Sequence, residues 1–250
     1  MIISHAHRFV YLKTRKTAGS SVEVALSRLC QPGDVFTWLP KNYEDTRSNV
    51  EVKSSPTTLT LPNGQTAKIA GHMTYSAMIR QFGPKILTYR VITNERNPFD
   101  KLVSAYFYLS ARRLSNDVDW KTDLKSEIQK GFLGPCEGIY SLSGVSIADN
   151  IIRYEHLETD VELLAQDMDV VGKLYLSERV EASDRPAMSK GKDNLREMFA
   201  DTELQRFVRN RFSGSFMTMG YHGVCDDCPQ FKPFEARQML RDAWAEKLLS

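Results

Sequence analysis

Three cations and a run of small residues stand together in the segment "LKTRKTAGSSVEVALSRL", which begins at Leu12. The cations are Lys13, Arg15 and Lys16. The small residues are Thr17, Ala18, Gly19, Ser20 and Ser21. Backbone N–H groups of such a loop can close around a phosphate, and the dipole of a following helix favours an anion there. The segment therefore predicts an anion-binding loop, with Lys16 supplying charge.

The order of the residues separates this loop from the loop that holds ATP and magnesium. The ATP-type loop has the sequence G-x-x-x-x-G-K-[ST], with the lysine directly ahead of Ser or Thr at its end. Here Lys16 precedes the small residues. The alternative is that the segment is only an exposed basic turn.

The elements that must position this loop are a strand before it and a helix after it. Residues 8–13, "RFVYLK", are aromatic and β-branched, and an apolar i, i+3, i+4, i+7 pattern begins at Val22. A second junction of this kind follows "KILTYRVIT", a predicted buried strand at residues 85–93. After it, Asn97 suits a helix N-cap and Pro98 the first helical position, which leaves Arg96 in the loop.

Further strands and helices alternate along the chain. A short helix is predicted from Tyr75 to Phe82, directly after His72, and "NIIRY" from Asn150 is a predicted strand. A capping-box spacing at Thr159 predicts the start of another helix. This alternation predicts an α/β fold in which helices flank a central parallel sheet, with ligands bound at the carboxyl ends of the strands.

The chain of 250 residues is predicted to form one domain over residues 1–250. Residues 40–70 are polar and form a predicted surface insertion with a hairpin at Asn63-Gly64, and residues 193–250 are predicted to be largely helical. The net charge of +2 argues against a protein that coats nucleic acid. We expect no membrane span, because no apolar run is long enough, and a cytoplasmic protein, because no signal-peptide pattern is present.

Four cysteines are too few and too scattered to predict a disulfide framework. The segment "HGVCDDCPQF" places His222, Cys225 and Cys228 at metal-ligand spacing, but a structural zinc site needs a fourth ligand. We expect reduced thiols, with a zinc site as the alternative, and no metal requirement.

Two segments resemble the cofactor motifs of sulfotransferases that use 3′-phosphoadenosine 5′-phosphosulfate (PAPS). They are "KTRKTAGSSVEVAL" and "ERNPFDKLVSAYFY", and "IIRYEHLETDVELL" is similar to the R-Y-E-x-L segment of the same superfamily. The resemblance favours the branch that sulfates carbohydrates, including heparan sulfate 2-O-sulfotransferases and their bacterial relatives. It covers about four fifths of the chain in outline and implies a P-loop-like, three-layer version of the α/β fold.

The resemblance implies a role for each matching residue. Lys16 to Ser21 would hold the 5′-phosphosulfate, with Lys13 and Arg15 beside them, and Lys16 would be catalytic. Arg96 and Ser104, eight residues apart, match the pair that binds the 3′-phosphate. The loop that closes over the nucleotide would be Ser189, Lys190, Gly191 and Lys192. The family often has proline before the catalytic lysine, where this chain has Arg15.

The expected reaction is direct in-line transfer of a sulfuryl group from PAPS to a hydroxyl of a small-molecule or glycan acceptor, leaving PAP. The departing oxygen needs a stabilising charge, which Lys16 would supply. Gly71-His72 resembles the catalytic histidine segment of the 2-O-sulfotransferases, and a neutral imidazole is a competent base.

Structural explanations compete with each of these assignments. Arg96 could be a surface salt-bridge partner, Ser104 a packing residue, and His72 a polar neighbour of a helix. Lys190 and Lys192 could be solvated charges. Two other functions also fit the phosphate loop: a kinase-like phosphotransferase, which would need a magnesium site, and a non-catalytic nucleotide-binding or glycan-binding module.

Overall fold

A computed structural model describes residues 1–39, 58–61, 64–110, 119–177, 190–224 and 231–249 of the chain. The chain divides into two compact units. The first comprises Met1–Asn94, Glu137–Glu181 and Lys232–Ser250, and the second comprises Glu95–Cys136 and Ala182–Phe231. The prediction of one domain over residues 1–250 stays a prediction.

A five-stranded sheet with the order β3-β1-β2-β6-β9 forms the centre of the first unit. Its strands are β1 (Ile2–Ser4), β2 (Phe9–Leu12), β3 (Val35–Phe36), β6 (Arg90–Glu95) and β9 (Asn150–Arg153). Strands β2 and β6 are parallel, with Leu12 opposite Thr93, whereas β1 is antiparallel to β2 and β3. The α/β class is confirmed, but the sheet is mixed. Residues 5–8 are too short a connection for a crossover, so β1 and β2 can only form a hairpin.

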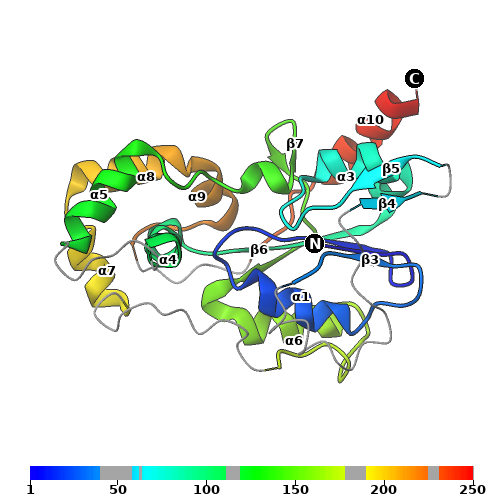
Figure 1. The fold of residues 1–250 in the computed structure, drawn as a ribbon, viewed down its shortest axis with the longest axis horizontal. Coiled ribbons are helices and arrows are strands. Elements are labelled where there is room, and N and C mark those ends of the chain that lie inside the picture. Colours follow the sequence, from blue (N-terminus) through cyan, green and yellow to red (C-terminus); the bar gives the residue numbers. More distant parts are fainter. Residues whose placement is uncertain (40–57, 62–63, 111–118, 178–189, 225–230, 250) are drawn as a thin grey trace. The chain divides into compact units, whose positions relative to one another are not determined.

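Helices cover both faces of this sheet (Figure 1). One face carries α1 (Gly19–Ser27) and α6 (Leu157–Asp167), and the other carries α3 (Tyr75–Phe82), the 3₁₀ helix η2 (Pro84–Thr88) and α10 (Arg237–Leu249). Phe9 and Tyr11 of β2 pack in a core cluster with residues of α1 and α6. Because all four residues of β2 are buried, its sequence is continuously apolar rather than alternating.

Two predicted boundaries shift in the structure, and a third is confirmed. The stretch predicted as one strand from residue 85 begins as η2, because Pro84 at its start favours a helical turn, and β6 begins only at Arg90. The predicted capping box is wrong, because α6 already begins at Leu157 and Thr159 lies inside it. The short helix after His72 is confirmed as α3, which ends before Gly83 with φ 86°.

The first unit also contains smaller elements. The 3₁₀ helices η3 (Glu137–Ile139) and η4 (Tyr154–His156) and the hairpin β7 (Ser141–Leu142) and β8 (Val145–Ser146) lie around β9 in sequence. Strands β4 (Thr58–Thr60) and β5 (Thr66–Lys68) pair antiparallel, as the hairpin pattern predicts, and Asn63 lies outside the described residues. None of the helices in the described ranges combines the length and apolar character that a membrane crossing requires.

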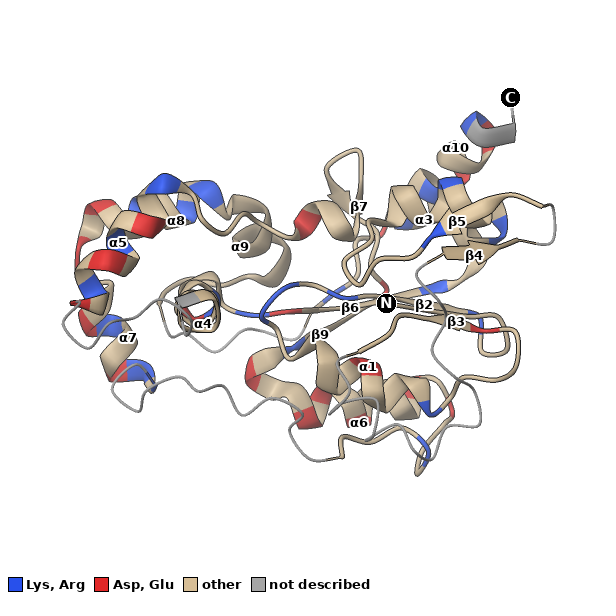
Figure 2. Cartoon of the chain, in the orientation of Figure 1, with Lys and Arg blue, Asp and Glu red and all other residues tan. Residues whose placement is uncertain are grey.

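The described part of the second unit is built from helices. They are α4 (Pro98–Ser110), α5 (Trp120–Lys130), α7 (Lys192–Met198), α8 (Thr202–Arg211) and α9 (Ser213–Met219). The ring of Phe99 packs edge-on against Phe199 and Phe216, at centroid distances of 4.8 and 5.7 Å. Both signs of charge are interspersed on α5, α7 and α8 (Figure 2). The predicted N-cap is confirmed, because the amide of Phe99 donates to Asn97 Oδ1 at 3.1 Å.

The partly buried carboxylate of Asp149 attaches α10 within the first unit. Asp149 accepts hydrogen bonds from Arg237 Nε at 2.7 Å, from Arg241 Nη2 at 2.8 Å and from the Val91 amide at 2.8 Å. Burial alone would raise the pKa of Asp149, but these bonds and the charge of Arg241 hold its pKa below the ordinary value of 3.8. The ionised form is therefore the one that stabilises the fold.

Replacing this carboxylate tests how firmly α10 is attached. We expect Asp149→Asn to lower the free energy of unfolding by about 1.5–3 kcal/mol at neutral pH, because bonds to a charged acceptor are lost. Since the pKa is lowered in the folded chain, the difference from wild type should shrink as the pH falls below about 4. Asp167→Asn is the control, because Asp167 pairs with Arg90 but is 53% exposed and should cost under about 1 kcal/mol. Urea unfolding at several pH values measures both, and equal losses would contradict the anchoring role.

Candidate active site

The predicted anion loop lies between β2 and α1 in the first unit. Ala18 is the N-cap residue of α1, and the Val22 amide donates to the Ala18 carbonyl at 3.2 Å. Because β2 runs parallel to β6, the loop and the residues that follow Thr93 lie at the same edge of the sheet. The predicted order of strand, loop and helix is confirmed.

The backbone of the loop alternates in handedness. Lys16 has φ 60° and Ala18 has φ 61°, while Thr17 between them has the ordinary negative φ. Alternation of this kind can turn successive N–H groups towards one point, which is how a backbone nest binds an anion. Positive φ costs a residue with a side chain about 1–3 kcal/mol, so surrounding contacts must hold the loop in shape. The sequence does not indicate positive φ at these two positions, because neither residue is a glycine.

Asn94 supplies those contacts from the end of β6. Its Nδ2 donates to both the carbonyl and the Oγ1 of Thr17, at 2.6 Å each. The hydroxyl of Thr17 lies 2.8 Å from Thr14 Oγ1, and Thr14 Oγ1 donates to the Asn94 carbonyl at 2.5 Å. The three residues form a closed ring of hydrogen bonds in which Thr17 is pinned between the two left-handed positions. Sequence analysis missed Asn94, which lies between Thr93 and Glu95 at the polar end of β6.

Tyr11 reaches the same ring from β2. Its hydroxyl lies 2.8 Å from Asn94 Oδ1 and 3.1 Å from the Gly19 carbonyl, and its one proton can be donated to either acceptor. Burial, together with the nearby charge of Glu23, raises the pKa of Tyr11 well above its ordinary value. The hydroxyl therefore remains a neutral donor that links the strand to the first residue of α1.

Lys13 folds back onto α1. Its ammonium lies 3.1 Å from Glu23 Oε2 and donates to Ser20 Oγ at 3.0 Å. Glu23 is fully buried, and its Oε1 also accepts from the Met1 ammonium at 3.1 Å and from Thr37 Oγ1 at 2.6 Å. Sequence analysis missed Glu23. A buried carboxylate in a helix face that is otherwise apolar needs such partners, and that requirement was the signal.

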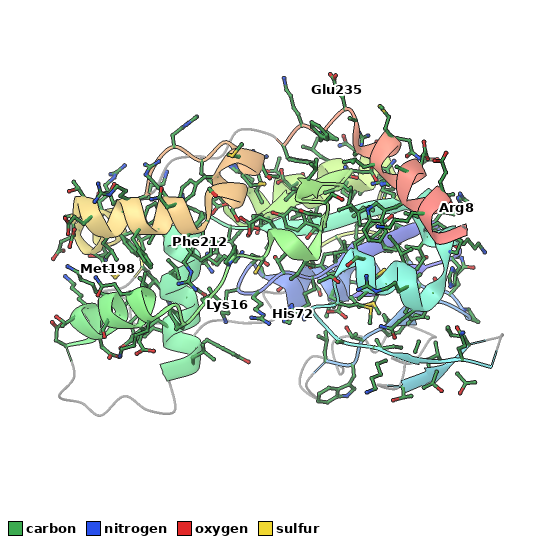
Figure 3. The ribbon with its side chains drawn as sticks, turned by 90° about the horizontal axis from the view of Figure 1, so that it is seen from above. Arg8, Lys16, His72, Met198, Phe212 and Glu235 are labelled. Atoms are coloured by element: carbon green, nitrogen blue, oxygen red, sulfur yellow. The ribbon has the colours of Figure 1, made fainter. Side chains whose placement is uncertain are left out.

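His72 is attached to the first residue of the loop. Its Nδ1 lies 2.9 Å from the Lys13 carbonyl, and Figure 3 shows His72 and Lys16 projecting in the same region of the first unit. Although the residue keeps much of its exposed surface, partial desolvation lowers its pKa, and the charges of Lys13 and Arg15 lower it further, against the opposing effect of the hydrogen bond. The ring is therefore neutral at pH 7. Its bond is to the loop rather than to α3, the helix that it precedes.

The remaining residues of the loop differ in exposure. Arg15 is exposed, whereas Lys16, Ala18 and Ser20 are partly buried. Thr17, Gly19 and Ser21 are buried. The structure therefore brings together the loop from Lys13 to Ser21, Asn94 and His72.

The predicted residues of the second motif belong to the second unit. Arg96 donates to Asp100 Oδ2 from Nε at 2.8 Å and from Nη2 at 2.5 Å. The side chain of Arg96 is 6% exposed and that of Asp100 is 18% exposed, so this ion pair is largely shielded from solvent and is not an exposed surface salt bridge. Ser104, one helical turn beyond Asp100, is also buried. A second buried pair, between Glu95 and Lys101, lies at the start of α4 with a separation of 2.5 Å.

The third predicted segment is described only in part. Ser189 lies outside the described residues, whereas Lys190, Gly191 and Lys192 are exposed at the start of α7. Asn194 Nδ2 donates to the Lys190 carbonyl at 2.6 Å. The exposure of Lys190 and Lys192 agrees with the alternative that they are solvated charges. Their role in closing over a nucleotide stays a prediction.

Metal ligands were predicted only as an alternative. Within the part of the chain that the structure describes, no cluster of three or more His, Cys, Asp or Glu side chains is arranged to hold a metal. Cys30 and Cys136 are buried thiols. Cys225 and Cys228 lie outside the described residues, so the zinc alternative stays a prediction.

Comparison of the chain with protein-family models, with curated proteins and with solved structures finds no significant match. The geometry of the loop is therefore the basis for any functional proposal.

Substitutions at Ala18 test whether the loop holds its left-handed backbone. Ala18→Val should lower the free energy of unfolding by about 1–3 kcal/mol, because a β-branched residue fits positive φ poorly. Ala18→Gly is the matched control and should keep wild-type stability or gain slightly, since glycine adopts this conformation without steric cost. Urea unfolding of the three proteins measures the difference. Equal stability of the valine and glycine variants would show that residue 18 does not hold positive φ.

Proposed function

We propose that the protein is a PAPS-dependent sulfotransferase with a P-loop-like, three-layer α/β fold. In this proposal it transfers a sulfuryl group to a hydroxyl of an acceptor, most suitably a carbohydrate. One observation carries the proposal: the loop with left-handed Lys16 and Ala18 lies between a parallel strand and a helix, and a neutral histidine is bonded to the carbonyl of Lys13 at the start of that loop. The order of the two sequence motifs supports PAPS over other phosphorylated donors.

The residues present fit the donor in two places. The nest from Lys16 to Ser21 suits the 5′-phosphosulfate, because its N–H groups and one cation face an anion. Arg96 and Ser104 suit the 3′-phosphate, because a guanidinium is a fixed fork of donors that matches phosphate oxygens. Asp100 holds that guanidinium in one orientation. Arg15 and the segment from Ser189 to Lys192 are proposed to add charge around the nucleotide.

His72 is proposed to act as the general base. A carbonyl oxygen only accepts hydrogen bonds, so the bond to Lys13 places the ring proton on Nδ1 and leaves the lone pair on Nε2. The lowered pKa keeps this nitrogen unprotonated at neutral pH. Nε2 then takes the proton of the acceptor hydroxyl as its oxygen bonds to sulfur.

Lys16 is proposed to stabilise the departing oxygen. When bound, PAPS supplies the sulfuryl group, and PAP leaves with the electron pair of the broken S–O bond. The Lys16 ammonium and the N–H groups of the nest meet the negative charge that develops on that oxygen. Because the hydrogen bonds of Asn94 hold the loop backbone at Thr17, little reorganisation of the N–H groups is needed at the moment of transfer.

Removal of the Lys16 ammonium tests the catalytic part of the proposal. Lys16→Ala should lower turnover by about two or more orders of magnitude, because charge in the transition state is left unstabilised. Lys173→Ala, which removes an exposed cation from the same unit, should keep wild-type turnover. Radiolabelled PAPS with a panel of carbohydrate acceptors, scored by product mass, measures the rates. Near-normal turnover of Lys16→Ala would remove this residue from the mechanism.

The choice between PAP and ADP tests the donor itself. Wild-type protein should bind PAP at least roughly tenfold more tightly than ADP, because bonds to a charged 3′-phosphate are worth about 1.5–3 kcal/mol. Arg96→Ala and the milder Ser104→Ala should lose most of this preference, whereas Ser126→Ala on α5 should keep it. Calorimetric titration measures each Kd, and thermal unfolding checks that the variants fold.

The alternatives predict other titrations. Equal affinity for ADP and PAP would overturn the sulfotransferase proposal and favour the kinase-like phosphotransferase. Equal loss of both ligands in Arg96→Ala would make Arg96 structural, because its buried pairing with Asp100 would then be its main role. PAP preference without turnover on any acceptor would favour the non-catalytic binding module.

A further inference from the structure

We propose that Lys13 is a positioning residue rather than a ligand of the donor. Clamped by Glu23, it fixes the start of the anion loop and selects the tautomer of His72. The catalytic role of the His72 tautomer rests on the proposed function. The contact between Lys13 and Glu23 and the tautomer itself can be tested without assuming that function.

The side chain of Lys13 is largely buried within the first unit. Its ammonium forms an ion pair with Glu23 and donates a hydrogen bond to Ser20, and only 13% of the side chain is exposed. A buried carboxylate such as Glu23 is stable only with charged or hydrogen-bonding partners, so the pair costs energy to open. Arg15 and Lys16, by contrast, are exposed and partly exposed cations of the same loop.

Gly19 leaves space for the side chain of Lys13 because it has no Cβ atom. A Cβ atom placed on Gly19 would lie 2.7 Å from Lys13 Cγ and 3.2 Å from Lys13 Cε. Gly19 does not have positive φ, so its backbone does not require glycine. The reason for glycine at this position is therefore the close approach of the lysine stem as it crosses α1 to reach Glu23.

The backbone of the same lysine holds His72. The carbonyl of Lys13 accepts from Nδ1 at 2.9 Å, and a neutral imidazole has one N–H donor, so Nε2 is left as the acceptor. If this bond were lost, the proton would be shared between the two ring nitrogens, and fewer rings could accept a proton at Nε2. The clamp on the side chain thus acts on the base through the position of the carbonyl.

The groups charged near His72 are Lys13, Arg15 and the Met1 ammonium, and all three lower its pKa. A change of charge alone therefore moves the pKa without any change of tautomer. The tautomer of His72 is therefore the quantity to measure. It responds to the position of the Lys13 carbonyl, whereas the pKa of His72 also responds to the charge of Lys13.

The test is ¹⁵N NMR of protein labelled in its histidine rings, with the His72 signals assigned by their absence in His72→Gln. In wild type the neutral ring should be almost entirely the Nδ1–H tautomer. Lys13→Met keeps an apolar stem but loses the ammonium, and Gly19→Ala displaces the stem without changing charge. Both should shift His72 towards a roughly even mixture of tautomers. Arg15→Met is the matched control, which should raise the pKa of His72 and leave its tautomer unchanged.

Each outcome decides the proposal. A wild-type ring protonated on Nε2, or an unchanged tautomer in folded Lys13→Met and Gly19→Ala, would overturn it. If those two variants do not fold, Ser20→Ala removes one bond of the clamp and should produce a smaller shift in the same direction, and no shift would count against the proposal. Titration of the same wild-type sample with PAP and ADP tests the proposed function separately, since the tautomer is measured without any ligand.

Discussion

The side-chain amide of Asn94 is the interaction on which the candidate site depends. It joins the ends of two parallel strands, because both of its N–H groups bond to Thr17 in the loop after β2. An amide buried without partners would cost several kcal/mol, so the ring is either fully formed or strongly unfavourable. The strain at Lys16 and Ala18 persists because Thr17 cannot move without breaking this ring.

The polar groups beneath the loop form two sets, and the members of each set are joined by hydrogen bonds or ion pairs. Tyr11, Thr14 and Asn94 hold the backbone of the loop, and Glu23 with Thr37 holds the side chain of Lys13. Both sets are buried within a layer that is otherwise apolar. The cost of burying them is offset only by complete pairing, which makes the edge of the sheet rigid where an anion would bind.

Local signals made part of this arrangement predictable from the sequence. The strand, loop and helix around Lys16, the N-cap at Asn97 and the short helix after His72 follow from patterns within a few residues. The antiparallel β1 was not predicted, since "MIIS" is too short to show a period. Asn94 and Glu23 were not predicted as site residues, because their roles depend on contacts with parts of the chain that are distant in sequence.

Charge alone does not distinguish the three cations of the loop in the sequence. Lys13, Arg15 and Lys16 look equivalent in the sequence, yet Lys13 lies against a buried carboxylate and Arg15 faces solvent. Arg96 also shows that the sequence does not reveal how far a charged residue is buried. Its i, i+4 spacing to Asp100 was visible, but the burial of that pair depends on how helices of the second unit pack.

The ring at Asn94 also sets the order in which the chain can acquire its shape during synthesis. Thr17 and Asn94 are 77 residues apart, so the loop lacks its bonds to Asn94 until β6 has left the ribosome. At about 5–20 residues per second this delay lasts roughly 4–15 s. During that interval the ring at Asn94 cannot close, so the contacts that hold Thr17 between the two left-handed positions form only after the second parallel strand has been made.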